Sequence, residues 1–179
     1  MNKNELAVEI FKNSHLTGDF LLRSGQRSNE YFDKYLFESN PGLLKAIIKE
    51  MKLLIPQNTE TLAGLEMGGI PLVTALSIET GIVSAFVRKN AKEYGTCKAA
   101  EGAEVNGRNV CVIEDVVTTG GQIIKSVQEL RNRGAKIETV LCVILRNPDA
   151  NEILAKEGLN LKSVLTMEFI NEAAGNEKR

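Results

Sequence analysis

Apolar positions near the start of the chain follow helical spacing and then change to another pattern. Over the first dozen residues, three of them share one face: Leu6, Ile10 and Phe11. The stretch Thr17-Gly-Asp19 interrupts this period, so the pattern predicts a short N-terminal helix. From Phe20 to Lys34, two short apolar pieces flank a Ser-Gly turn, which predicts a hairpin-like excursion.

The next helix signal lies between two prolines. Asn40 can cap a helix, Pro41 suits its first turn, and Pro56 ends the pattern. A single apolar stripe runs between them, made of Leu44, Ile47, Ile48, Met51 and Leu54. We therefore expect a helix that begins directly after Asn40 and packs this stripe on the core.

Beyond these residues, strand-like and helix-like segments alternate. Four apolar runs are typical of buried strands: 61–66, 83–87, 110–113 and 139–145. Helical segments separate them, one from Pro71 to Thr80 that closes at Gly81, and one that ends at Gly134 with a face of Ile123, Ile124, Val127 and Leu130. This alternation predicts an α/β fold, a parallel, doubly wound sheet flanked by helices.

The chain shows no internal repeat and no low-complexity linker, so we expect a single domain over residues 1–179. Within it, we expect a small N-terminal hood over residues 1–35, a core over 36–170 and a frayed end over 171–179. A chain of 179 residues can bury a core of ordinary size without disulfides or structural metal.

Composition excludes several classes of function. The 22 Lys and Arg nearly balance the 23 Asp and Glu, and a net charge of −1 gives no overall attraction to nucleic acid or to an anionic membrane. The longest stretch without charge, Met67 to Ile78, has 12 residues, fewer than the roughly 18 that span a bilayer. The start shows no secretory pattern, so we expect a cytoplasmic protein. Three cysteines and one histidine form no metal-ligand set, and we expect reduced thiols.

In a parallel sheet, ligands bind beyond the carboxyl ends of the strands. At those ends the sequence places Glu66-Met-Gly-Gly, Arg88-Lys89, Glu114-Asp115 and Arg146. The segment from Arg88 to Arg108 joins two strands with little apolar periodicity, which is typical of a functional lid or a mobile segment.

The sharpest motif is VCVIEDVVTTGGQ, from Val110 to Gln122. A buried strand carries two adjacent carboxylates, Glu114 and Asp115, and a turn rich in threonine and glycine then opens a helix. Backbone N–H groups of residues 117–121 can cradle an anion there, and the helix dipole favours it. Acids beside a phosphate suit a ligand that also offers hydroxyls or a bound cation, such as a phosphorylated sugar. The alternative is an ordinary capped strand-to-helix turn.

This motif resembles the phosphoribosyl pyrophosphate (PRPP) signature of the type I phosphoribosyltransferases. Three further segments, in the right order, are similar to the orotate phosphoribosyltransferase family: Leu22 to Asp33, Val87 to Gly95 and Leu145-Arg146. The similarity covers nearly the whole chain. It implies the type I phosphoribosyltransferase fold with a small N-terminal hood.

The resemblance also implies the reaction, a Mg²⁺-dependent transfer of the phosphoribosyl group from PRPP to orotate that gives orotidine 5′-monophosphate and pyrophosphate. It implies that Glu114 and Asp115 are catalytic and meet the ribose hydroxyls, and that substrate oxygens rather than protein side chains hold most of the Mg²⁺. It assigns the sugar phosphate to the turn, with its flanking residues: Val116, Val117, Thr118, Thr119, Gly120, Gly121 and Gln122.

Further roles come from the same resemblance. Lys92 is implied to be catalytic and, with Arg88 and Lys89, to close over the pyrophosphate of a neighbouring subunit, so a homodimer with shared active sites is expected. The side chains implied to bind the pyrimidine or its surroundings are Arg23, Tyr31, Phe32 and Arg146.

The residues by themselves leave other interpretations open. The three cations at 88, 89 and 92 fit a solvated cluster, the aromatic pair fits the core, and Arg146 fits a helix cap or a pair with Asp149. As a whole, the chain also fits a phosphoribosyltransferase for a purine or for uracil, or a regulator that binds PRPP without chemistry.

Four positions depart from the family pattern. Gly68 stands where many orotate enzymes carry lysine, and Tyr94 replaces a histidine that is common in the mobile loop. Arg23 stands where lysine is frequent, and Gln122 ends the signature where a small hydroxyl residue or alanine is usual. These departures bear on kinetic efficiency rather than on identity.

Overall fold

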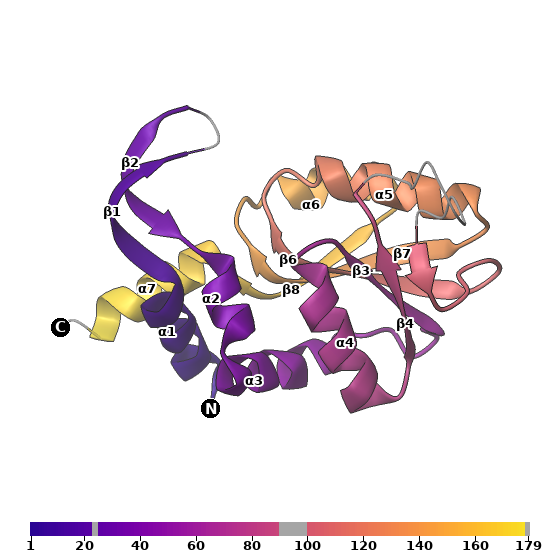
Figure 1. The fold of residues 1–179 in the computed structure, drawn as a ribbon, viewed down its shortest axis with the longest axis horizontal. Helices are drawn as coiled ribbons and strands as arrows, with labels where there is room; N and C mark the ends of the chain where they lie inside the picture. Colours follow the sequence, from indigo (N-terminus) through magenta and orange to yellow (C-terminus); the bar gives the residue numbers. More distant parts are fainter. Residues whose placement is uncertain (23–24, 90–99, 178–179) are drawn as a thin grey trace.

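A six-stranded sheet forms the centre of the computed structural model, which describes residues 1–22, 25–89 and 100–177 (Figure 1). The strand order is β5-β4-β3-β6-β7-β8. The strands are β3 (Thr61–Leu65), β4 (Val83–Val87), β5 (Ala100–Gly102), β6 (Asn109–Val117), β7 (Lys136–Leu145) and β8 (Asn160–Thr166). All neighbours are parallel except β5, which pairs antiparallel with β4 at one edge. The predicted α/β fold is confirmed, with an antiparallel edge strand added.

Helices cover both faces of this sheet. On one face lie α1 (Lys3–Ser14), α3 (Pro41–Lys52), α4 (Gly69–Thr80) and α7 (Met167–Glu177); on the other lie α5 (Gly121–Asn132) and α6 (Ala150–Ala155). Two hydrophobic cores lie one on each face of the sheet. Alternate residues of a strand belong to different cores, because successive side chains point to opposite faces. Thus Leu62 and Ile113 join the first core, and Ala63 and Val112 join the second.

Local signals in the sequence mark the helix ends correctly. The Asn40 side chain accepts hydrogen bonds from the backbone N–H groups of Gly42 and Leu43, which begins α3 as predicted. Gly81 ends α4 with φ of 76°, a left-handed conformation that glycine adopts without steric cost.

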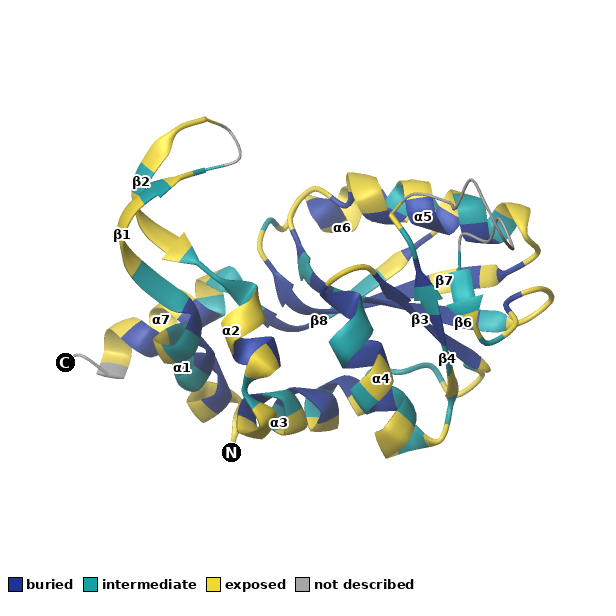
Figure 2. Cartoon of the chain, in the orientation of Figure 1, coloured by how far each residue is buried: buried dark blue, intermediate teal, exposed yellow. Residues whose placement is uncertain are grey.

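The N-terminal excursion is a two-stranded antiparallel hairpin that projects from the body, with β1 (His15–Leu21) and β2 (Arg27–Phe32) (Figure 1). Most of its residues are exposed or only half-buried (Figure 2). An ion pair between Arg27 and Asp19 bridges the strands. The rings of Phe20 and Tyr31 lie 5.5 Å apart. The hairpin prediction is confirmed.

Several short elements escaped the sequence pattern: α2 (Lys34–Ser39), β5, β8 and α6. The expected frayed end over residues 171–179 is wrong for residues 171–177, which continue α7. Ala173 and Ala174 are buried there, and Ile170 and Ala173 belong to the first core, so packing orders a segment whose composition looked polar. No helix in the described ranges is long and apolar enough to span a membrane.

Candidate active site

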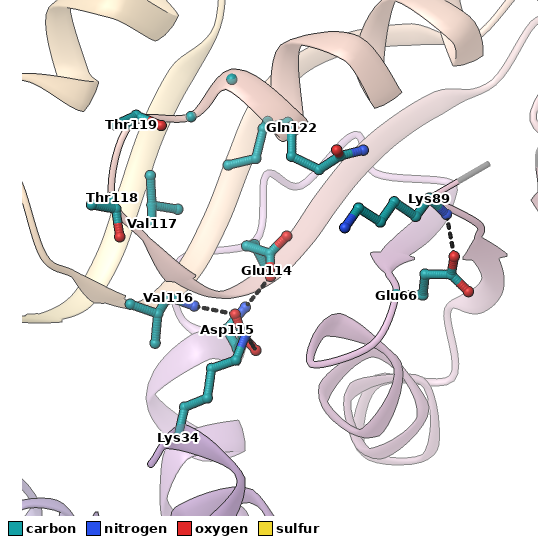
Figure 3. Close-up of a pocket in the computed structure, with 13 residues that line it drawn as sticks. Lys34, Glu66, Lys89, Glu114, Asp115, Val116, Val117, Thr118, Thr119 and Gln122 are labelled. Atoms are coloured by element: carbon teal, nitrogen blue, oxygen red, sulfur yellow. Dashed lines mark hydrogen bonds and ion pairs between the residues drawn. The ribbon is translucent and has the colours of Figure 1, made fainter. Parts of the chain in front are cut away.

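A cavity of about 470 Å³ opens at the carboxyl ends of the central strands (Figure 3). Four stretches contribute: the end of β6 with the turn into α5, the residue after β3, the connection that follows β4, and the first residue of α2. Its lining residues are Lys34, Glu66, Lys89, Glu114, Asp115, Val116, Val117, Thr118, Thr119, Gly120, Gly121, Gln122 and Ile123.

The turn after β6 has the features of an anion site. Thr118 and Thr119 are exposed, and Gly120 sits at the N-cap of α5 with φ of 75°. No side chain caps this helix. The first N–H groups of a helix have no intrahelical partner, so those of α5 remain available to a bound anion, and the helix dipole adds to the attraction.

The two acids differ in position, although they are neighbours in sequence. Asp115 is fully buried, whereas Glu114 is half-buried. The backbone N–H of Asp115 donates to Glu114 Oε1 at 3.0 Å, and that of Val116 donates to Asp115 Oδ1 at 2.5 Å. The Lys34 ammonium lies 2.5 Å from Asp115 Oδ2, an ion pair without hydrogen-bond alignment.

The acids also differ in charge. Burial raises the pKa of Glu114 well above its ordinary value, and the neighbouring Asp115 raises it further. Burial alone would raise the pKa of Asp115 too, but its contacts with Glu114 and Lys34 outweigh burial and lower it. The two shifts have opposite directions, so within the pair negative charge is favoured on Asp115 over Glu114.

A third buried carboxyl, Glu38 on α2, faces the same cluster. Burial raises its pKa to about 8, and the charge of Asp115 contributes. Its Oε1 is buried without a hydrogen-bond partner. Glu38 is therefore neutral at pH 7.

Glu38 predicts a pH dependence of stability. Its pKa rises from 4.5 to about 8 on folding, so the folded state binds the extra proton between those values and loses stability as the pH rises. Glu38→Gln, which cannot ionise, should therefore gain melting temperature over the parent, by a margin that grows from pH 5 to 8 and then levels off. Melting curves at five pH values measure this margin, with the exposed Glu79→Gln as control. A margin independent of pH would contradict the assignment.

Two predicted cations lie at the start of the long connection. Lys89 lines the cavity, and its backbone N–H donates to the carboxylate of Glu66 (Figure 3). Arg88 does not line it; its guanidinium Nε lies 3.8 Å from Glu101 Oε1 on β5. Lys92, like Arg23 and Tyr94, lies outside the described residues.

The residues expected to hold the base are not among the described lining of this cavity. Tyr31 is 43% exposed on the hairpin, and Phe32 is half-buried against the first core. Arg146 is exposed at the end of β7, where its backbone N–H donates to Val117 O at 2.8 Å. Thus the backbone of Arg146 lies next to Val117, which lines the cavity, whereas Tyr31 and Phe32 belong to the projecting hairpin.

Sequence reasoning missed Lys34 and Glu38, and it noted Glu66 only as part of a strand end. The available signal for Lys34 was its place directly after Tyr31-Phe32-Asp33, in the segment that carried the family resemblance. Nothing in the local pattern indicates that this lysine reaches β6, because that contact joins residues far apart in the chain.

The donor set bears on Mg²⁺. Within the described ranges, no group of three or more His, Cys, Asp or Glu side chains could hold a metal ion. Mg²⁺ commonly binds through one or two carboxylates together with substrate phosphates and water. An acidic pair beside an anion turn fits a metal that arrives with its substrate better than a resident ion.

Comparison with known proteins defines the class. A family model described as a phosphoribosyl transferase domain matches residues 36–173. The chain belongs to this family, in agreement with its sheet, its acidic pair and its anion turn.

Its similar relatives are more specific. The orotate phosphoribosyltransferase of Nocardioides sp. is 49% identical, over 94% of both chains. That of Methanocella arvoryzae is 41% identical, over 88% of this chain and 91% of the relative. The crystal structure of the Mycobacterium tuberculosis H37Rv orotate phosphoribosyltransferase in complex with PRPP matches with a TM-score of 0.80 and 28% identity, covering 94% of this chain and 98% of that one. The resemblance to orotate phosphoribosyltransferases is confirmed.

Proposed function

We propose that this protein transfers the phosphoribosyl group of PRPP to orotate, forming orotidine 5′-monophosphate and releasing pyrophosphate. The observation that carries the proposal is the meeting of an ionised buried acid, a half-buried acid and an uncapped helix N-terminus in one cavity. These groups suit a ligand with a phosphate, a diol and a reacting carbon that becomes cationic. The names of the similar relatives point to orotate as the acceptor base.

The sugar phosphate is assigned to the turn from Val117 to Gly121, where backbone N–H groups and the dipole of α5 meet an anion. Glu114 faces the ribose hydroxyls from its half-buried position. Asp115 places a negative charge beside the carbon that loses pyrophosphate, and a fixed charge in a dry site stabilises the cationic character that develops there.

The departing pyrophosphate needs cations. Lys89 reaches this cavity, and we assign Lys92 and Arg88 to the same task. Orotate is assigned to Arg146, whose guanidinium can meet its oxygen acceptors, with Tyr31, Phe32 and Arg23 from the N-terminal segment. The half-exposed position of Tyr31 leaves its ring available to a base.

Mg²⁺ belongs to the proposal as an ion that substrate oxygens would hold for the most part. When bound, it neutralises charge on the leaving group. Glu114 and Glu66 border the cavity in which that ion would arrive. The reaction is placed in the cytoplasm, a reducing compartment, which agrees with the free, buried state of Cys111 and Cys142.

A homodimer with shared sites is supported by the surface of α4. This helix buries Leu72, Val73 and Leu76, and up to Ile78 the chain carries no charged side chain on its outer side. Met67 is 61% and Ile78 83% exposed, and Val83 follows at 55%. Between Met67 and Ile78 the polar side chains are two hydroxyls: that of Thr74 donates to Ile70 O at 2.8 Å and that of Ser77 donates to Ile82 O at 2.7 Å, so both are partly withdrawn from water. Such an apolar surface suits a second copy of the chain.

Ile78→Glu should therefore convert the dimer to a monomer and lower turnover at least about tenfold, because a charge at the centre of an apolar interface is costly to bury. Sedimentation measures the assembly and an activity assay the turnover. Leu53→Glu, at an exposed leucine beyond α3, is the control and should change neither. A parent that sediments as a monomer would contradict the assigned assembly.

The reaction itself is tested with purified protein, PRPP and Mg²⁺, and with orotate, uracil, adenine and hypoxanthine in parallel. Orotate should be consumed with stoichiometric release of pyrophosphate, and the other bases should react far more slowly. Turnover with a purine and not with orotate would show that the purine is the substrate. Tight binding of PRPP with no turnover of any base would make the protein a regulator.

A further inference from the structure

Lys34 is the first residue of α2, and its ammonium reaches across to the sheet. It lies 2.5 Å from Oδ2 of Asp115, a side chain with no exposed surface, while the Lys34 side chain itself is 33% exposed and lines the cavity (Figure 3). The backbone at Lys34 is held by the N-cap of α2, because the Asp33 side chain accepts a hydrogen bond from the backbone N–H of Tyr35. The lysine therefore extends from a capped helix end onto the buried acid.

The surroundings of Asp115 are predominantly acidic. Glu114 adjoins it on β6, Glu38 faces it from α2 and Asp33 precedes that helix. Glu66 borders the cavity beyond β3, and the thiol of Cys142 lies across on β7, its pKa raised by burial and by both acids of β6. Among the described residues that line the cavity, the positive side chains are Lys34 and Lys89, and Lys34 is the one paired with Asp115.

The backbone at Gly68 covers another side of Asp115. A Cβ built on Gly68 would lie 1.5 Å from Asp115 Oδ2 and 2.3 Å from its Cγ. No side chain at position 68 can share this space with the carboxylate. A cation can therefore approach Asp115 from the α2 side, which is where Lys34 stands.

We propose that Lys34 is a positioning residue for the transfer reaction, which acts by holding the Asp115 carboxylate ionised and fixed in its place beside the cavity. The inference rests on the proposed function and adds a residue to it. A buried carboxylate without a partner either takes up a proton or turns toward water, and both would remove the charge from beside the reacting carbon. Lys34 prevents both through one contact.

The test is a double-mutant cycle of parent, Lys34→Met, Asp115→Asn and the double variant. Lys34→Met should lower kcat/KM for PRPP about 30- to 100-fold, the effect of losing support for a buried charge. On the Asp115→Asn background the same change should cost less than about threefold, because the group through which Lys34 acts is already neutral. Equal losses on both backgrounds would overturn the proposal.

Three further measurements separate positioning from folding. The acid limb of the pH profile of kcat/KM should move to higher pH in Lys34→Met, since Lys34 lowers the pKa of Asp115. Lys34→Arg, which keeps the charge, should recover most of the lost activity. Lys52→Met removes a lysine from an exposed ion pair with Glu79 and should leave kinetics and melting temperature unchanged. An unmoved profile, or no rescue by arginine with the fold intact, would count against Lys34.

Calorimetric titration of the same four proteins with PRPP separates this inference from the proposed function. If the parent binds PRPP but does not turn over orotate, the base assignment fails, while the cycle in PRPP affinity still tests Lys34. Coupling between Lys34 and Asp115 in affinity would support the proposal, and additivity would overturn it. A parent that binds no PRPP would overturn both.

Discussion

Replacing Asp115 with asparagine should lower kcat about 100- to 1,000-fold, because it removes the negative charge of the fully buried acid from beside the reacting carbon. The side chains have nearly the same shape, so the loss reports charge rather than packing. Circular dichroism and a melting curve should show an intact fold, and initial rates with saturating orotate and PRPP give the change in kcat.

The neighbouring acid provides the matched control. The pKa of Glu114 is raised by burial and by Asp115, so the pair favours negative charge on Asp115, and Glu114→Gln removes less charge from the site than Asp115→Asn. We expect a loss of no more than about tenfold, far below that of Asp115→Asn. Two equal losses, or the larger one at Glu114, would contradict the assignment of the charge to Asp115.

Replacing Gly68 with alanine is the second change with a large expected effect. The added Cβ would overlap the carboxylate of Asp115, which Lys34 and the backbone N–H of Val116 hold from other directions. Asp115 must then move. We expect kcat/KM to fall about 100-fold or more, with a melting temperature several degrees lower, the usual result of overpacking a buried site.

The expected effect of Gly68→Ala does not come from the backbone conformation of Gly68. Gly68 has φ of −67°, which any residue can adopt, so the expected loss is steric. Gly175→Ala, in α7 with no atom within 4 Å of its new Cβ, is the control and should be neutral or slightly stabilising. Full activity in Gly68→Ala would show that Asp115 can move without consequence, and the charge would then need another source.

The same contact explains one departure from the family pattern. The resemblance led us to expect lysine where this chain has Gly68. In the structure the space next to position 68 is filled by Asp115, and a lysine from α2 contacts that acid. In this arrangement a side chain at position 68 would overlap Asp115.

Short-range patterns located most of the sheet and its helices, and they failed at short elements. The α3 helix, with its Asn40 cap and apolar stripe, and the buried run of β7 carry enough repeats of one period to be recognised. The helices α2 and α6 have six residues each, fewer than two full turns, so no period can establish itself. The β6 strand was expected to stop at Ile113 but continues to Val117, because pairing with β7 extends through the acids.

By itself, the sequence determined the α/β class, the position of the acidic pair before a glycine-rich turn, and the family, since these depend on neighbouring residues and on local hydrogen bonding. Only the tertiary structure shows which acid is fully buried, which cation contacts it, and that a side chain at position 68 would overlap Asp115. Those properties depend on desolvation and on contacts between Lys34, Gly68 and Asp115, which lie on three separate elements. Burial and charge pairing are set only when the chain has folded and brought these elements together.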